Sequence, residues 1–156
     1  MRQEGKRYYI DSLPYEIELT ARLCHENARR ILEQYTDTIS IDEFTVLDTI
    51  VAKPDLSQAD LARIILKGKA HTGRFLMSLE DKGLVKRHVL DRDGKLIKVS
   101  VVTEKGMTLY NDLIQGFRPH VEQFEKLISE EEVVSIVYNL QKLRESIEKV
   151  SKIVFE

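Results

Sequence analysis

The sequence is poor in cysteine and has no long apolar run. Its single cysteine, Cys24, cannot form a disulfide within the chain. No stretch approaches the roughly 20 apolar residues of a membrane-spanning helix, and the first ten residues, MRQEGKRYYI, lack the apolar core of a secretory signal. With 42% hydrophobic and 32% charged residues among 156, the composition is that of a globular domain. We therefore expect a cytoplasmic protein that does not associate with membranes.

Motifs of common enzyme classes are also missing. The sequence contains no glycine-rich phosphate loop, no CxxC and no HExxH. Its four histidines, at positions 25, 71, 88 and 120, never stand three or four residues apart. No two of them can therefore share one helical face as metal ligands. We predict a protein that is not an enzyme and that has neither a metal site nor a cofactor.

Residues 55–106 carry the pattern around which the chain is organised. Two short amphipathic helical segments flank a break at Lys67 and Gly68. The first begins at Ser57, which can form a capping box with Asp60. Its expected inward residues share one helical face and are Leu61, Ile64 and Ile65. The pattern predicts two helices joined by a tight turn.

The second helix and a hairpin follow directly. The helix is expected to pack inward through Phe75, Leu76 and Leu79, and Gly83 is typical of the position just beyond a helix C-terminus. Residues 84–90 and 96–102 are predicted strands, joined by a turn at 91–94 that ends in Asp-Gly. Thr103 can then cap the next helix. This order is the layout of a winged helix-turn-helix, whose second helix enters the DNA major groove.

Positive charge is concentrated in the same stretch. Residues 63–98 hold 10 Lys and Arg against 4 Asp and Glu, a net +6, whereas the whole chain is −2 and the remainder is therefore −8. A basic segment within an acidic protein suits a surface that binds phosphates. A solvated face of ordinary helices is the alternative, but the charge coincides with the predicted second helix and wing.

The motifs LSQADLARII, FLMSLEDKGLVKR, DRDGK and VVTEKG resemble the MarR family of bacterial transcriptional regulators. The resemblance implies a dimeric winged-helix protein that binds pseudo-palindromic DNA and releases it when a small molecule or an oxidant acts on it. We take a repressor as the first hypothesis. A winged-helix module that binds protein is the competing class, although such an adaptor has no evident need for the basic residues.

The resemblance also implies which residues meet DNA. It places the base-reading positions on the second helix and a wing arginine at Arg92. The expected DNA-binding set is Ser57, Gln58, Lys67, Lys69, Ala70, His71, Gly73, Arg74, Lys86, Arg87, Arg92 and Lys95. Three residues depart from the family pattern: Thr72 replaces an apolar residue, Gly73 a hydroxyl residue and Lys95 a second arginine. The base preference therefore stays open.

Helices are expected on both sides of this stretch. One should run from Pro14 to about Gln34, and another should cover Asp42–Ala52 and end before Pro54. The inward residues expected for the latter are Phe44, Leu47, Ile50 and Val51. A helix over Glu104–Gln115 should break or kink near Phe117, because Gly116 and Pro119 follow it.

The last helix carries a regular apolar seam. It begins at a second capping box, Ser129 with Glu132. The seam residues alternate in spacings of four and three and are Ile136, Leu140, Leu143, Ile147, Val150 and Val154. Leu13 and Ile17 of the first helix, together with a second copy of the chain, are the expected cover. An intramolecular core helix is the alternative.

The predicted fold is mostly α with a small β-wing. Residues 1–38 form an N-terminal dimerisation helix, 39–106 the winged helix-turn-helix, and 107–156 the C-terminal dimerisation helices. The predicted partners are double-stranded DNA and a second copy of the chain.

Two mechanisms of release stay open. A small-molecule effector of unknown identity would sit between the first helix, the Asp42–Ala52 helix and the helix after Thr103. Its conceivable lining residues are Ile31, Phe44, Asp48 and Tyr110. The other mechanism is oxidation of Cys24, since some members of the family sense peroxide through a cysteine on the first long helix. A lone cysteine in an apolar stripe is, however, usually a small core residue.

Overall fold

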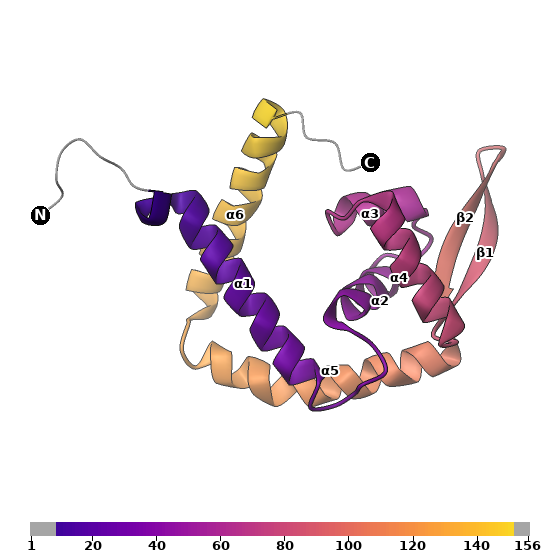
Figure 1. The fold of residues 1–156 in the computed structure, drawn as a ribbon, viewed down its shortest axis with the longest axis horizontal. Coiled ribbons are helices and arrows are strands. Elements are labelled where there is room, and N and C mark those ends of the chain that lie inside the picture. The colour runs from indigo at the N-terminus through magenta and orange to yellow at the C-terminus, as the bar shows by residue number, and fades with distance from the viewer. Residues whose placement is uncertain (1–8, 152–156) are drawn as a thin grey trace, which may run out of the picture. The chain divides into compact units, whose positions relative to one another are not determined.

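The computed structural model describes residues 9–151, which fold into helices and one hairpin (Figure 1). Its elements are η1 (Tyr9–Asp11), α1 (Leu13–Leu32), α2 (Ile41–Ala52), α3 (Gln58–Ile64), α4 (Lys69–Asp81), β1 (Val85–Arg92), β2 (Lys95–Val102), α5 (Glu104–Glu125) and α6 (Glu130–Ser151). The chain divides into two compact units, Met1–Ile41 and Asp42–Glu156. None of the helices in the described part is long and apolar enough to cross a membrane. The fold is the predicted winged helix-turn-helix with flanking helices.

Local sequence signals account for α1. Ser12 caps it by accepting a hydrogen bond from the Tyr15 backbone N–H at 3.5 Å, and Pro14 stands in the first turn, where its missing N–H costs nothing. The helix ends at Leu32, two residues before the predicted end. Hydrogen bonds from Arg29 and Arg30 lower the pKa of Glu26 to about 2. These charged groups lie on the solvated part of the helix surface.

Cys24 of α1 is exposed in the single chain, whereas the sequence favoured a small core residue at this position. Leu32 is the one buried residue along this helix. Neighbours in the same stripe, such as Leu23 at 71% exposure, are open as well. An amphipathic stripe becomes a core only where another element covers it. The long helix α1 and the short η1 are the helices that the structure describes in the first unit.

The core of the second unit collects one face from each of several elements. Its buried apolar residues are Val46, Leu47, Ile50, Leu61, Ala62, Leu76, Leu79, Leu84, Val85, Val99 and Leu113. Leu47 and Ile50 were predicted, whereas the fully buried Val46 was not. Ile64 is 40% exposed, which corrects its predicted inward position. The seven-residue α3 instead buries Leu61 and the adjacent Ala62, because a short helix between α4 and β2 is covered over a narrow sector.

The second helix of the motif is fixed at both ends. Thr72 is fully buried, and its hydroxyl donates to the Gly68 carbonyl at 3.2 Å, which makes a polar residue acceptable at an apolar position. Gly83 ends the helix with a φ of 72°, as predicted. The Leu84 N–H donates to the Leu79 carbonyl and the Gly83 N–H to that of Glu80, each at 2.9 Å. This pair of backbone hydrogen bonds forms a Schellman C-cap.

An ion pair that sequence reasoning missed links α4 to α2. Lys82 Nζ lies 2.6 Å from Glu43 Oε1, and the Glu43 side chain is only 7% exposed. The two residues are 39 positions apart, so no local pattern could have paired them. Removing either partner would leave a charge poorly solvated.

The wing is a regular antiparallel hairpin. Its register runs from Val85 opposite Val102 to Arg92 opposite Lys95, which leaves Asp93 and Gly94 as a two-residue loop. Both loop residues have positive φ, 53° and 77°, as a type I′ turn requires. The strands are therefore longer toward the tip than predicted, because the hairpin pairs residues that the sequence reading assigned to the turn.

Helix α5 begins as predicted but does not break. Thr103 Oγ1 accepts from the Gly106 N–H at 3.0 Å, and a Cβ at Gly106 would collide with the Leu84 carbonyl oxygen. The helix passes through Gly116 and Pro119 to Glu125, so the predicted break near Phe117 was wrong. Gln115, four residues before the proline, is exposed, and water can bind the carbonyl that Pro119 leaves without a donor.

Helix α6 starts at the predicted capping box and remains uncovered. Ser129 Oγ accepts from the Glu132 N–H at 3.3 Å, while Glu132 Oε2 accepts from the Ser129 N–H at 2.9 Å. No residue of α6 is buried among those described. The seam residues Ile136, Leu140 and Ile147 are 51%, 41% and 46% exposed. Leu143 is half-buried, and Val154 lies outside the described residues.

Candidate nucleic-acid interface

Helix α4 presents an open face along its first half. Lys69, Ala70, His71 and Arg74 are all exposed, and none of the three cationic or imidazole side chains pairs with a carboxylate among the described residues. Ala70 and Arg74 are four residues apart and so share one helical row. Met77, 54% exposed, continues this row three residues on. Helical spacing from Arg74 was the signal that could have found Met77.

Gly73, assigned to DNA contact by resemblance, lies beside Gln58 in this structure. The Gln58 Nε2 donates to the Lys69 carbonyl at 3.1 Å and thereby connects the first turns of α3 and α4. A Cβ at Gly73 would stand 2.8 Å from that same nitrogen. Gln58 is thus engaged within the motif, while its other amide hydrogen and its oxygen remain for a further partner.

Ser57 acts primarily as the cap of α3. Its Oγ accepts from the Asp60 N–H at 3.1 Å and donates to Asp60 Oδ2 at 2.7 Å. The hydrogen bond from Ser57, followed by the charge of Arg63, lowers the pKa of Asp60. Ser57 also forms a β-bridge with Val99 of the wing. The helix-turn-helix and the hairpin are therefore joined at the first turn of α3.

The remaining cations of the predicted set fall into two groups. Lys67 lies 3.6 Å from Asp42, and Arg87 lies 3.0 Å from Glu80. These two side chains have carboxylate partners on the protein. Lys86 and Lys95 on the wing are exposed, and neither belongs to an ion pair in the part of the chain that the structure describes.

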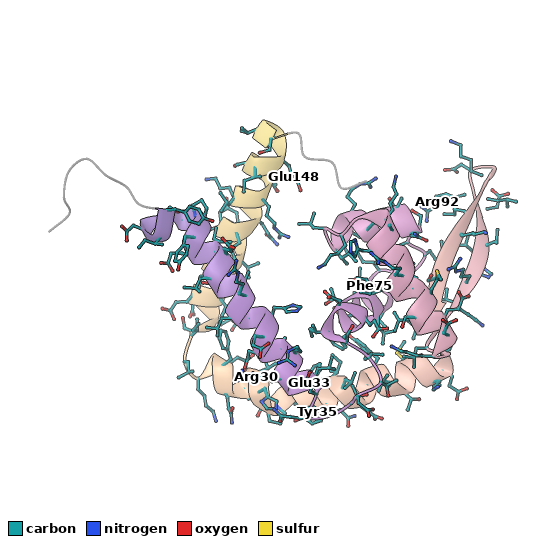
Figure 2. All side chains as sticks on the ribbon, viewed as in Figure 1. Arg30, Glu33, Tyr35, Phe75, Arg92 and Glu148 are labelled. Carbon is teal, nitrogen blue, oxygen red and sulfur yellow. The ribbon has the colours of Figure 1, made fainter. Side chains whose placement is uncertain are left out.

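Arg92 occupies the end of β1, beside the loop of the wing. Its guanidinium donates to the backbone carbonyl of Asp55 at 2.7 Å, so the side chain turns back toward the segment before α3 (Figure 2). Asp55 itself has a φ of 64°, a left-handed conformation that aspartate tolerates better than most residues. Arg92 is therefore exposed to solvent and also held by its hydrogen bond to Asp55.

Three of the proposed effector residues come together between α2 and α5. The Tyr110 hydroxyl donates to Asp48 Oδ1 at 2.9 Å, and the Tyr110 ring lies parallel to Phe44 with centroids 6.2 Å apart. Phe117 approaches Phe44 edge-on at 5.2 Å. Burial and the bond to Asp48 raise the pKa of Tyr110. Ile31 belongs to the other unit.

The surface of α4 and the wing has the chemistry to bind phosphates and to form hydrogen bonds with base edges. A helix with exposed donors at its N-terminal half fits the DNA major groove, and arginine and lysine supply both phosphate contacts and bidentate contacts to guanine. In the part of the chain that the structure describes, no three histidine, cysteine, aspartate or glutamate side chains are placed to hold a metal ion.

Known structures share this fold. The MepR–DNA complex of S. aureus is 23% identical with a TM-score of 0.74, and the match covers 90% of this chain and 99% of that one. A MarR/EmrR family transcriptional regulator from Acinetobacter sp. ADP1 is 20% identical with a TM-score of 0.80, covering 92% and 100%. PcaV from Streptomyces coelicolor, solved with its natural ligand, is 14% identical with a TM-score of 0.71, covering 92% and 100%.

The family comparison agrees with the fold. No curated protein matches the chain in sequence. The MarR family model matches residues 39–97, which contain α2, α3, α4, β1 and the start of β2. The sequence motifs that resemble this family lie within residues 56–106, and the model covers all of them except VVTEKG at 101–106. The family model thus matches the larger part of the winged helix-turn-helix, and this part of the chain is similar to the MarR family.

Proposed function

We propose that the chain is a homodimeric transcriptional regulator, a repressor, that binds pseudo-palindromic double-stranded DNA. The observation that carries this proposal is the open face of α4, where Lys69, His71 and Arg74 are exposed without carboxylate partners next to an exposed basic wing. In an acidic chain, such a cluster has a destabilising self-repulsion that phosphates would relieve. Helix α4 enters the major groove, and the wing meets the backbone or the minor groove.

The solved relatives support DNA as the partner. MepR of S. aureus has been solved in a complex with DNA and in a DNA-binding conformation, and both structures share this chain's fold. A regulator with one recognition helix per protomer reads two half-sites only as a two-fold dimer. In this proposal residues 1–38 and 107–156 form the dimerisation helices, and 39–106 read the DNA.

The uncovered apolar residues of α1 and α6 support dimerisation. Leu13 is 62% exposed, Ile17 is half-buried, and Val150 of the α6 seam is 83% exposed. Monomers rarely leave contiguous apolar surfaces of this kind in water. A second copy that covers both helices would bury them, as it would bury Leu143 and the rest of the seam.

An effector site between α2 and α5 is the second part of the proposal. Phe44, Asp48 and Tyr110 offer an aromatic surface with one hydrogen-bonded carboxylate. PcaV, with the same fold, has been solved with a natural ligand. A small molecule that inserts here would displace the Tyr110–Asp48 bond and release DNA by moving α2 against α5.

The test is selection of DNA from a pool of random duplexes, followed by binding titrations at several salt concentrations. We expect an enriched site with two inverted half-sites about 10 base pairs apart and affinity that falls steeply with salt. Arg118→Ala, an exposed arginine of α5 outside the basic face, is the matched control and should bind like the wild type. Failure to enrich any sequence would favour the protein-binding alternative.

Oxidation of Cys24 is the alternative trigger; its thiol is exposed in the single chain, on the same helix whose apolar face the proposed dimer would cover. A peroxide can reach an exposed thiolate directly. Peroxide should release the selected duplex from the wild type and not from Cys24→Ser if this alternative holds. Equal behaviour of the two proteins would assign release to the effector alone.

A further inference from the structure

We infer that Gln58 positions the recognition helix and that residue 73 is glycine to admit the Gln58 carboxamide. The inference rests on the proposed function, because it assigns a role in reading DNA to a contact inside the motif. It replaces the expectation that Gly73 touches DNA itself. The juxtaposition is between the first residue of α3 and the first turns of α4.

The orientation of the Gln58 side chain is fixed by chemistry. Its partner is the backbone carbonyl of Lys69, at 3.1 Å. A carbonyl only accepts hydrogen bonds, so the amide nitrogen must face it and the amide oxygen must point elsewhere. One amide hydrogen and the oxygen therefore remain free at the place where the N-termini of both helices approach a DNA backbone.

Backbone geometry does not explain the glycine. Gly73 lies inside α4 and is not among the residues with positive φ, so any residue could adopt its conformation. A glycine within a helix is less favourable than alanine, and it needs another reason here. The three nearest neighbours of a Cβ at this position are atoms of Gln58: Nε2 at 2.8 Å, Cδ at 3.7 Å and Oε1 at 3.9 Å.

An added methyl would therefore collide first with the end of the Gln58 side chain. Real Cβ atoms essentially never approach another atom as closely as 2.8 Å, and the end of a glutamine side chain can swing away at small cost. That swing breaks the bond to Lys69. The first turn of α4, which carries Ala70 and lies one turn before Arg74, then loses its tie to α3.

The consequence is a pair of effects with opposite signs. Gly73→Ala should leave the melting temperature unchanged or raise it by up to about 3 °C, since alanine favours the helix. The same change should weaken binding to the selected duplex by about three- to tenfold, the size expected for one lost hydrogen bond. Binding to a scrambled duplex should change less than twofold, because phosphate contacts remain. A purely structural residue would lower both stability and affinity.

The experiment compares wild type, Gln58→Ala, Gly73→Ala and the double variant. Each protein is titrated with the selected and the scrambled duplex and is melted without DNA. We expect the double variant to bind like Gln58→Ala, because Gly73 matters only through Gln58. Gln58→Met, which keeps the length of the side chain and removes the donor, should behave like Gln58→Ala.

Two results would overturn the inference. If adding Gly73→Ala to Gln58→Ala lowers the affinity for the selected duplex by as much as Gly73→Ala does in the wild type, the added methyl meets DNA directly. If Gly73→Ala keeps full discrimination, the Gln58 contact does not position α4. If the wild type shows no preference for any duplex, the proposed function is wrong, and the melting data alone test the contact. In that case, changes in melting temperature that add up in the double variant would refute a coupling between Gln58 and Gly73.

Discussion

At the scale of the residue, Arg74 and Arg92 differ in what holds them. Arg74 stands on the open row of α4 and has no ion-pair partner among the described residues, whereas Arg92 donates to the Asp55 carbonyl at 2.7 Å. An exposed arginine without an ion-pair partner can align both donors of its guanidinium with one guanine. Arg92 must exchange or share its hydrogen bond to Asp55 before it contacts DNA. Its net contribution to the binding free energy is therefore smaller than that of Arg74.

Alanine at these two positions should separate base reading from backbone binding. Arg74→Ala should weaken binding to the selected duplex by about 1–3 kcal/mol and leave binding to random DNA nearly unchanged. It should also flatten the preference at one base position in each half-site. Arg92→Ala should weaken binding to both duplexes. It should also reduce the slope of log affinity against log salt concentration by about 0.9 per contact, roughly two for a dimer. Titrations at four salt concentrations measure both effects. An equal loss for both duplexes in Arg74→Ala would mean that α4 grips the backbone.

Single residues also mark how far the site could be predicted. Ser57 and Thr103 were recognised as caps because the spacing of a cap and its N–H partner is local. The partners of Lys67 and Gln58 were not, since Asp42 lies 25 positions before Lys67 and the Lys69 carbonyl belongs to another helix. Position in a motif placed these side chains on the DNA face. Only the folded chain shows which of them already have a partner.

At the scale of the element, helix boundaries followed local chemistry better than helix interiors did. The end of α4 at Gly83 and the tight turn at Asp93 and Gly94 depend on φ values that few residues adopt. The passage of α5 through Pro119 could not be predicted the same way. A proline removes one hydrogen bond, and whether the helix survives depends on the rest of α5, including Leu113, which is buried.

The junction between α4 and the wing offers a test of this argument. Gly83→Ala should lower the free energy of unfolding by about 1–2 kcal/mol, because alanine at a φ of 72° is strained although the space around it is open. Urea unfolding measures the change. Gly83→Asn is the matched control, since asparagine tolerates this conformation and should recover much of the loss. Equal losses for both variants would point to a packing cause.

At the scale of the whole molecule, the sequence predicted an apolar row on the last helix and proposed a second copy of the chain as its cover. The heptad spacing of α6 was read correctly as one apolar row, and the row is open in the chain alone. The same holds for Leu23 and Cys24 of α1. Cover from a second chain leaves no signal in one sequence beyond an unpaired stripe. The uncovered faces of α1 and α6 are therefore informative about assembly and not about errors of folding.

The seam of α6 can be tested by adding charge to it. Leu140→Asp combined with Ile147→Asp should convert the proposed dimer into monomers or aggregates, because an interface that buries two unpaired carboxylates per chain loses several kcal/mol. DNA affinity should fall with it, since a monomer holds one recognition helix. Sedimentation over a range of concentrations measures the assembly, and circular dichroism shows whether each chain retains its helices.

The neighbouring row of the same helix provides the control. Asn139→Asp with Ser146→Asp adds the same two charges seven residues apart, at exposed polar positions whose hydrogen bonds stay within α6. This variant should remain dimeric and bind DNA, because its carboxylates stay in water. If both variants dissociate, added charge on α6 acts through general repulsion. If neither does, the dimer contact lies elsewhere and the exposed seam needs a different partner, so the two variants together decide whether Leu140 and Ile147 face a second copy.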